Sequence, residues 1–182
     1  ADKKANKLIK SIHLKYPDTK IVVYGCYAQL KPDFIKNIEG VSTVIGTEKK
    51  FDINKILSQE FKHDNYDSAI ENAKRFNISY SINERTRAFI KIQDGCNYNC
   101  SFCTIPLARG KSRSLNIKNT LKEIKSIVTY DVKEIVLSGI NIGDFGYENN
   151  ETLEDLLREL EKIKKLKRYR ISSIEPNLLS EN

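Results

Sequence analysis

The chain has 182 residues, 40% hydrophobic and 30% charged, so it is long enough to bury a core and too apolar for a disordered protein. Its net charge of +7 fits nucleic-acid binding, but solvated lysines on helix faces explain it equally well. The apolar runs are far too short to cross a bilayer and no secretory signal is visible, so we expect a cytoplasmic protein with no membrane partner. In that compartment, clustered cysteines are more often metal ligands or catalytic groups than disulfides.

The first 65 residues alternate between helical and extended patterns. The expected elements, in chain order, are a helix at 3–15, a strand at 20–25, a helix at 31–40, a strand at 41–46 and a helix at 51–60. Pro32 suits the first turn of the second helix, and Gly40 suits the position just past its end. Residues 1–65 therefore predict a small α/β domain with a largely parallel sheet.

Residues 66–86 lose this rhythm and predict a linker, with room for a short helix and a strand. The alternation then resumes in residues 87–182, with strands expected at 88–93, 133–139 and 169–174 and helices beginning after Asn116 and Thr152. Asn116 is a suitable N-cap, and Thr152 with Asp155 forms a capping-box pattern. This βαβαβ order predicts a parallel sheet with helices on one face, equivalent to the first half of a (βα) barrel.

Three loops follow the ends of these strands. In barrels of this kind the chemistry lies at the C-terminal ends of the strands, so residues 94–110, 138–147 and 172–177 are expected to share one rim. Lys91 and Gln93 alternate with Ile90 and Ile92 along the first strand. Their polarity favours an inner face that lines a lumen over one that packs in a dry core.

The first of these loops contains Cys96, Cys100 and Cys103. A structural zinc site needs four ligands, and the fourth would have to come from outside the loop, for instance from Cys26. An iron-sulfur cube fits better, because three thiolates hold three irons and leave the fourth iron open to a small molecule. The missing fourth ligand is then the working feature of the site.

The spacing resembles the C-x-x-x-C-x-x-C signature of radical S-adenosylmethionine (SAM) enzymes. In that family an aromatic residue precedes the last cysteine, as Phe102 does here, and lies near the adenine of the cofactor. The resemblance implies that the amino and carboxylate groups of SAM chelate the open iron. One electron then cleaves the sulfonium and gives a 5′-deoxyadenosyl radical.

The flanking residues are similar to those of the radical SAM methylthiotransferases. The similar stretches are "GCYAQ", "RAFIKIQDGCNYNCSFCTIPLARG", "VLSGINIGDFG" and "RISSIEP". The last two look most like the branch that modifies N6-threonylcarbamoyladenosine at position 37 of tRNA. They look less like the branches that act on isopentenyladenosine or a ribosomal protein. The resemblance extends from about residue 20 to residue 176.

This resemblance implies an enzyme that adds a methylthio group to C2 of the adenosine. It implies two [4Fe-4S] clusters in the full-length enzyme, SAM, a tRNA substrate and an electron donor such as flavodoxin or ferredoxin. Cys26 matches one ligand of the second cluster, whose other two cysteines are expected before Ala1. The chain contains no methionine, and we interpret it as a fragment that lacks both ends of a longer protein.

Other residues have weaker predicted roles. Gly139 and Asn141 match the place where radical SAM enzymes bind the methionine end of the cofactor, although the same residues suit a plain turn. Arg109 and Arg113 flank the cysteine loop, where they contact the cofactor carboxylate, contact tRNA phosphate or pair with acidic residues. Glu175 is a further candidate. The two histidines, His13 and His63, are expected in solvent and receive no role.

Two other classes of function stay open at this point. One is a zinc-stabilised RNA-binding module with Cys26 as the fourth ligand, and the other is a one-electron iron-sulfur carrier. Cys26 by itself is also typical of a buried structural cysteine. The enzyme hypothesis explains why a radical cofactor is needed, since the C2–H bond of adenosine is too unreactive for acid–base chemistry.

Overall fold

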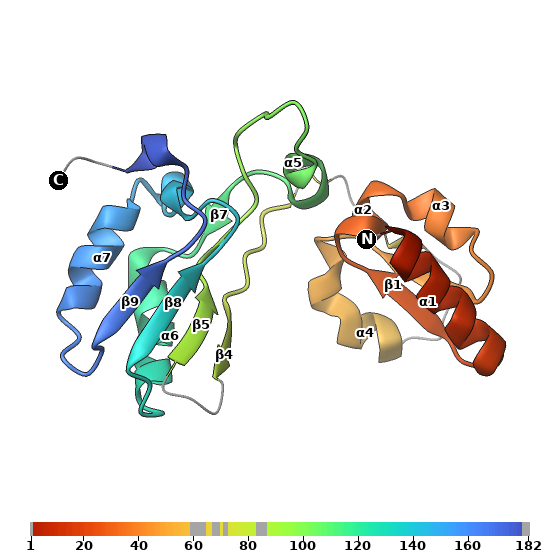
Figure 1. Ribbon diagram of the computed structural model, residues 1–182, viewed down its shortest axis with the longest axis horizontal. Coiled ribbons are helices and arrows are strands. Elements are labelled where there is room, and N and C mark those ends of the chain that lie inside the picture. The colour runs from red at the N-terminus through yellow and green to blue at the C-terminus, as the bar shows by residue number, and fades with distance from the viewer. Residues whose placement is uncertain (1, 59–64, 67–69, 71–72, 83–86, 180–182) are drawn as a thin grey trace. The chain divides into compact units, whose positions relative to one another are not determined.

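The computed structural model describes residues 2–58, 65–66, 70, 73–82 and 87–179. The chain divides into two compact units (Figure 1). Unit 1 consists of Ala1–Ala73 with Leu107–Gly110, and unit 2 consists of Lys74–Pro106 with Lys111–Asn182. The first division, between residues 73 and 74, falls within the segment predicted as a linker.

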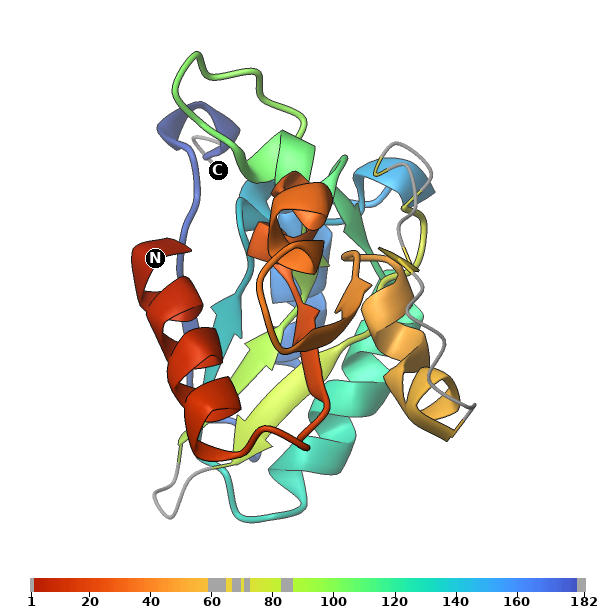
Figure 2. The same ribbon diagram turned by 90° about the vertical axis from the view of Figure 1, so that its right-hand side faces the viewer.

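Unit 1 is built on a parallel sheet of strand order β1-β2-β3. Its elements are α1 (Asp2–Lys15), β1 (Ile21–Tyr24), α2 (Cys26–Leu30), α3 (Pro32–Lys36), β2 (Val41–Ile45), α4 (Ile53–Ser58) and β3 (Asn65–Tyr66). Figure 2 shows α1 and α4 on opposite sides of β1 and β2. A core of Ile9, Ala28, Ile35, Ile38 and Val44 joins α1, α2 and α3 to the sheet. The α/β expectation for this part is therefore confirmed.

Two details of unit 1 differ from the expectations. The helix expected at 31–40 is one short turn, α3, and a further short helix, α2, begins directly after β1. Gly25, with φ 106°, makes the turn between β1 and α2. His13 is not in free solvent, because a Cβ on Gly40 would lie 2.5 Å from its ring, and its Nε2 lies 3.8 Å from Glu39 Oε1. His63 lies outside the described residues.

Unit 2 contains a four-stranded sheet of order β4-β5-β8-β9 and a separate pair, β6 with β7. Its elements are β4 (Ser79–Ile82), β5 (Arg87–Lys91), β6 (Gln93–Asp94), β7 (Arg113–Ser114), α6 (Ile117–Val128), β8 (Glu134–Ser138), α7 (Leu153–Glu161) and β9 (Arg168–Ile171). Strands β5, β8 and β9 are parallel, as predicted. Strand β4 lies in the predicted linker interval and pairs antiparallel with β5.

The core of unit 2 lies between this sheet and the helices α6 and α7. Alternate residues of β5 and β8 point toward the helices, as the period of two in a strand requires. The fully buried contributors from β5, β8, α6 and α7 are Ala88, Ile90, Ile124, Ile127, Ile135, Leu137, Leu156 and Leu160. Both helices therefore cover one face of the sheet, which is the arrangement predicted for part of a (βα) barrel. None of the described helices is long and apolar enough to span a membrane.

Both predicted helix caps are present. The side chain of Asn116 accepts a hydrogen bond from Asn119 N at 2.9 Å, and Thr152 and Asp155 form a reciprocal capping box at the start of α7.

Replacing Thr152 with Ala is expected to lower the free energy of unfolding by about 1 kcal/mol, because a backbone N–H of α7 loses its partner. Urea unfolding measures this. Thr129→Ala, at an exposed helix end, is the control, and equal losses would contradict the assignment.

Candidate functional site

The three loops that follow β6, β8 and β9 are joined by hydrogen bonds within unit 2. The loop after β8 is tied to the loop after β9, since Ile142 N donates to Ser173 O at 3.0 Å. The loop after β9 is tied to the cysteine loop, since Asn177 Nδ2 donates to Tyr98 OH at 2.6 Å. The predicted common rim is therefore seen in the structure.

The entry to the cysteine loop is a fixed turn. Asp94 is buried, and its Oδ1 accepts a hydrogen bond from Gly95 N at 3.0 Å. Its Oδ2 lies 3.1 Å from Lys91 Nζ and 3.7 Å from Arg113 Nη2, so its charge is compensated by two cations. Gly95 has φ 76°, which a residue with a side chain rarely adopts. This turn directly precedes Cys96 and fixes where the cysteine loop begins.

Arg113 is part of this support. It is 2% exposed, and it donates from Nε to Arg75 O and from Nη1 to Lys111 O, both at 3.0 Å. Of the three contacts considered for it, pairing with an acid is the one present, and the acid is the buried Asp94. Its burial keeps it away from an RNA phosphate.

The three thiols of the loop are free and lie in different surroundings. Cys96 and Cys103 are half-buried and Cys100 is exposed. Cys103 N donates to Cys100 O at 3.0 Å, which closes a turn. Burial raises the pKa of the Cys96 thiol, and the charges of Asp144 and the other two thiols act in the same direction.

The residues present fit an iron-sulfur cluster by the chemistry of their donors. Three free thiols supply the soft sulfur ligands that such clusters use. Within the described part of the chain, no three His, Cys, Asp or Glu side chains already stand in a metal-binding arrangement. Binding of a cluster therefore has to draw the three thiols together, and it releases their protons, because the thiolate is the ligand.

Two predicted cofactor residues have features that a ligand would satisfy. Phe102 is 91% exposed, although an aromatic ring of this size normally gains by burial. Asn141 is 3% exposed, and its Oδ1 accepts from Glu175 N at 3.2 Å. The Nδ2 of Asn141 is buried and has no hydrogen-bond partner in the described part of the chain. It is a donor for an incoming carboxylate or carbonyl group.

Gly139 lies where no side chain fits. A Cβ there would be 2.7 Å from Ile142 Cγ2, 2.8 Å from Gln93 Oε1 and 3.0 Å from Gln93 O. Its backbone is therefore held against the start of the cysteine loop. Glu175 is exposed, and only its backbone N–H contacts Asn141.

Sequence reasoning missed the role of Gln93. It expected a polar side chain facing a lumen, but Gln93 is fully buried. Its Oε1 accepts from Ile140 N at 2.9 Å and Asn141 N at 3.0 Å, while its Nε2 donates to Gly95 O at 2.7 Å and Ser112 Oγ at 2.8 Å. The available signal was a glutamine directly before the turn into the first cysteine.

Asp144 was also missed. Its carboxylate accepts a hydrogen bond from the backbone N–H of Asn97, and burial raises its pKa. It acts electrostatically on Cys96, and its Oδ2 is buried without a hydrogen-bond partner among the described residues. The sequence offered no signal for this contact, since "GDFG" suits an ordinary turn.

Two predicted site residues belong to unit 1. Cys26 is half-buried and is the first residue of α2, at the C-terminal end of β1. Arg109 ends the short helix α5 (Ile105–Arg109) and falls in the segment of that helix assigned to unit 1. The second-cluster role of Cys26 and the cofactor role of Arg109 stay predictions.

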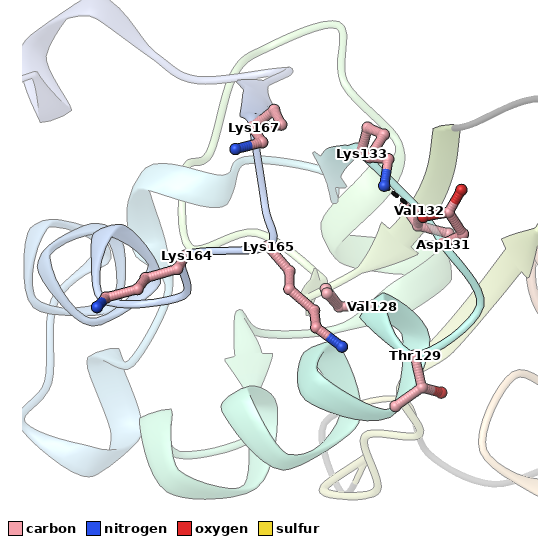
Figure 3. Close-up of a pocket in the computed structure, with 8 residues that line it drawn as sticks. All are labelled: Val128, Thr129, Asp131, Val132, Lys133, Lys164, Lys165 and Lys167. Carbon is pink, nitrogen blue, oxygen red and sulfur yellow. Dashed lines mark hydrogen bonds and ion pairs between the residues drawn. The ribbon is translucent and has the colours of Figure 1, made fainter.

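A separate pocket of unit 2 has a volume of about 320 Å³, and four of its eight lining residues are lysines (Figure 3). Its lining residues are Val128, Thr129, Asp131, Val132, Lys133, Lys164, Lys165 and Lys167. It lies where β8 and β9 begin, at the end of the strands remote from the cysteine loop. Because barrel enzymes carry their chemistry at the C-terminal ends of the strands, this pocket is no candidate active site. Exposed lysines near the C-termini of α6 and α7 are favoured there by the helix dipoles.

Comparison with known proteins agrees with the site. Residues 90–178 match the radical SAM superfamily. The chain is 36% identical to the threonylcarbamoyladenosine tRNA methylthiotransferase MtaB of Rickettsia prowazekii, and the alignment covers 96% of this chain and 42% of that protein. It is 38% identical to the MtaB of Thermotoga maritima, with 95% and 40% covered.

A relative of another branch is somewhat less similar. The tRNA-2-methylthio-N(6)-dimethylallyladenosine synthase of Thermodesulfovibrio yellowstonii is 30% identical, over 94% of this chain and 40% of that protein. The chain spans about two fifths of the length of these relatives. Domains of the matched superfamily generally hold a [4Fe-4S] cluster and SAM. Residues 90–178 therefore belong to the radical SAM superfamily, in a chain that is similar to tRNA methylthiotransferases over nearly its whole length.

Proposed function

We propose that the protein is a radical SAM methylthiotransferase that adds a methylthio group to C2 of N6-threonylcarbamoyladenosine at position 37 of tRNA. The observation that most strongly supports this proposal is the position of the three free thiols. They lie in a loop at the C-terminal end of the parallel sheet, inside the segment that matches the radical SAM superfamily. The choice of adenosine rests on the higher identity to the two MtaB proteins than to the dimethylallyladenosine synthase.

The described residues divide the work at the site. Cys96, Cys100 and Cys103 hold the [4Fe-4S] cluster, which when bound supplies the electron that cleaves SAM. Asn141 donates from its unpartnered Nδ2 to the methionine end of the cofactor. The exposed ring of Phe102 packs against the adenine. One SAM furnishes the radical and another furnishes the methyl group.

The proposed function also requires a second cluster and an electron donor. Cys26 is one ligand of a second [4Fe-4S] cluster, which needs two further cysteines. The electron comes from a donor such as flavodoxin or ferredoxin, and the enzyme works in the cytoplasm. A zinc-stabilised RNA-binding module, or a methylthiotransferase for isopentenyladenosine or a ribosomal protein, are the alternatives that experiment must separate.

Anaerobic reconstitution with iron and sulfide tests the proposal. We expect iron and sulfide in the purified chain, a broad visible absorption, and 5′-deoxyadenosine released from SAM under a reductant. Zinc without iron would support the RNA-binding module. A stable cluster that never cleaves SAM would support an electron carrier. Mass spectrometry of the nucleosides from tRNA incubated with the full-length enzyme identifies the modified base.

The chain by itself is expected to bind tRNA weakly. The pocket at the start of β8 and β9 is lined by four lysines together with Asp131, which pairs with Lys133. Four lysines can neutralise only a few phosphates of the tRNA backbone. We expect a Kd weaker than about 10⁻⁸ M at physiological salt, the range of specific nucleic-acid binding. Filter binding across a salt series measures it, and tighter binding would contradict this expectation.

A further inference from the structure

The buried side chain of Gln93 joins two loops that are far apart in the sequence. Its amide nitrogen donates to Gly95 O and Ser112 Oγ, at the two ends of the cysteine loop. Its amide oxygen accepts from Ile140 N and Asn141 N, in the loop after β8. One side chain therefore satisfies groups on both sides of the candidate cofactor site.

The contact between Gln93 and the loop after β8 is closely packed as well as polar. Gly139 leaves no space between the loop after β8 and Gln93, since its Cβ would lie 2.8 Å from Gln93 Oε1. The cysteine loop has a second tie at its far end, where Ser112 N donates to Asn97 Oδ1 at 3.0 Å. A shift of the Gln93 amide would therefore move both loops together. No solvent reaches this amide, because the residue is fully buried.

We propose that Gln93 is a positioning residue that sets the separation between the cysteine loop and the segment 139–141. The inference rests on the proposed function, in which the cluster on the cysteine loop and Asn141 in the segment 139–141 both bind the methionine end of the same SAM molecule. A cofactor that bridges an iron on one loop and Asn141 on the other binds well only when the two loops are held at one fixed separation. Gln93 acts through those loops and contacts no reacting atom itself.

Two substitutions separate the two ends of the amide. Gln93→Leu keeps the approximate size but removes all five hydrogen bonds of the amide, including the one from Nε2 to Asp94 O at 3.3 Å. An ionised glutamate in Gln93→Glu keeps an acceptor for Ile140 N and Asn141 N, but it has no donor for Gly95 O. Thr120→Val is the matched control, because Thr120 is also fully buried in unit 2 and its hydroxyl has no hydrogen-bond partner in the described chain.

The first readout needs no cofactor. Hydrogen exchange of the Ile140 and Asn141 amides is measured in the chain before reconstitution. Gln93→Leu is expected to speed exchange at both amides by about tenfold or more, the ratio that one lost hydrogen bond of ordinary strength produces. Gln93→Glu and Thr120→Val are expected to exchange at the rate of the unchanged chain.

The second readout is the binding of SAM to the reconstituted chain, followed by the change in the electron paramagnetic resonance (EPR) spectrum of the reduced cluster. We expect Gln93→Leu to keep the iron content of the unchanged chain and to weaken SAM binding by about tenfold or more. The KM for SAM in the cleavage assay should rise more than kcat falls. Gln93→Glu should also bind SAM more weakly, since the cysteine loop loses its tie.

The outcomes distinguish a failure of the positioning role of Gln93 from a failure of the proposed function. If the unchanged chain holds an iron-sulfur cluster and binds SAM but Gln93→Leu binds it equally well, the positioning role is wrong and the proposed function stands. If the unchanged chain takes up no cluster, the proposed function is wrong and the inference falls with it. Should Gln93→Leu fail to fold, Gln93→Glu decides, and unchanged SAM affinity in that variant would overturn the inference.

Discussion

Replacing Cys96, Cys100 or Cys103 singly with Ala is expected to abolish the [4Fe-4S] cluster of the radical SAM domain. A cube held by only two thiolates is poorly held. Each variant should therefore lose nearly all of the iron bound at this loop and all cleavage of SAM. Iron and sulfide analysis after anaerobic reconstitution measures the first loss, and release of 5′-deoxyadenosine measures the second.

Cys26→Ala is the matched control for these three variants. It lies in unit 1, whereas the three-cysteine loop lies in unit 2. We expect it to keep the radical cluster and its reaction with SAM. If Cys26→Ala instead removed all metal from the chain, the zinc hypothesis with Cys26 as the fourth ligand would be favoured over the iron-sulfur one.

A methyl group added at Gly139 is expected to have the second largest effect. The Cβ of Gly139→Ala would lie 3.0 Å from the backbone oxygen of Gln93 and 2.7 Å from Ile142 Cγ2, so the strand end and the loop must separate. Overpacking of this kind costs about 1–3 kcal/mol of stability. Because the same shift moves Asn141, SAM binding should fall by about tenfold or more. Urea unfolding and a SAM titration measure the two effects.

Gly143→Ala provides the comparison. The three atoms nearest to its Cβ would belong to the side chains of Leu178 and Ile174, whereas at Gly139 two of the three belong to Gln93. A similar loss of stability with little loss of SAM binding is the expected result there. If both variants lost SAM binding equally, the specific contact between Gly139 and Gln93 would not explain the effect.

The regular elements of the fold could be predicted because their signals are local. Helical spacing of apolar residues located α1, α6 and α7, and the pair Thr152 and Asp155 marked the start of α7. The parallel order of β5, β8 and β9 followed from the length of the helical connections between them. The spacing of Cys96, Cys100 and Cys103 was by itself enough to predict them as cluster ligands.

The features that were missed depend on contacts between distant residues. A strand was allowed for in the linker, but β4 could not be located there, because it is exposed along its length, shows no buried period and gains its structure from pairing with β5. His13 packs against Gly40, which the sequence gives no reason to expect. The hydrogen bonds of Gln93 join residues 47 and 48 positions apart, and no local pattern encodes such a link.

The EPR spectrum of the reduced, reconstituted chain, recorded before and after addition of SAM, tests the central claim most directly. The claim is that Cys96, Cys100 and Cys103 hold a cluster with one iron open to the cofactor. It predicts about four iron atoms at this loop and a spectrum that changes when SAM binds. A chain that holds zinc, or a cluster whose spectrum is the same with and without SAM, would contradict it.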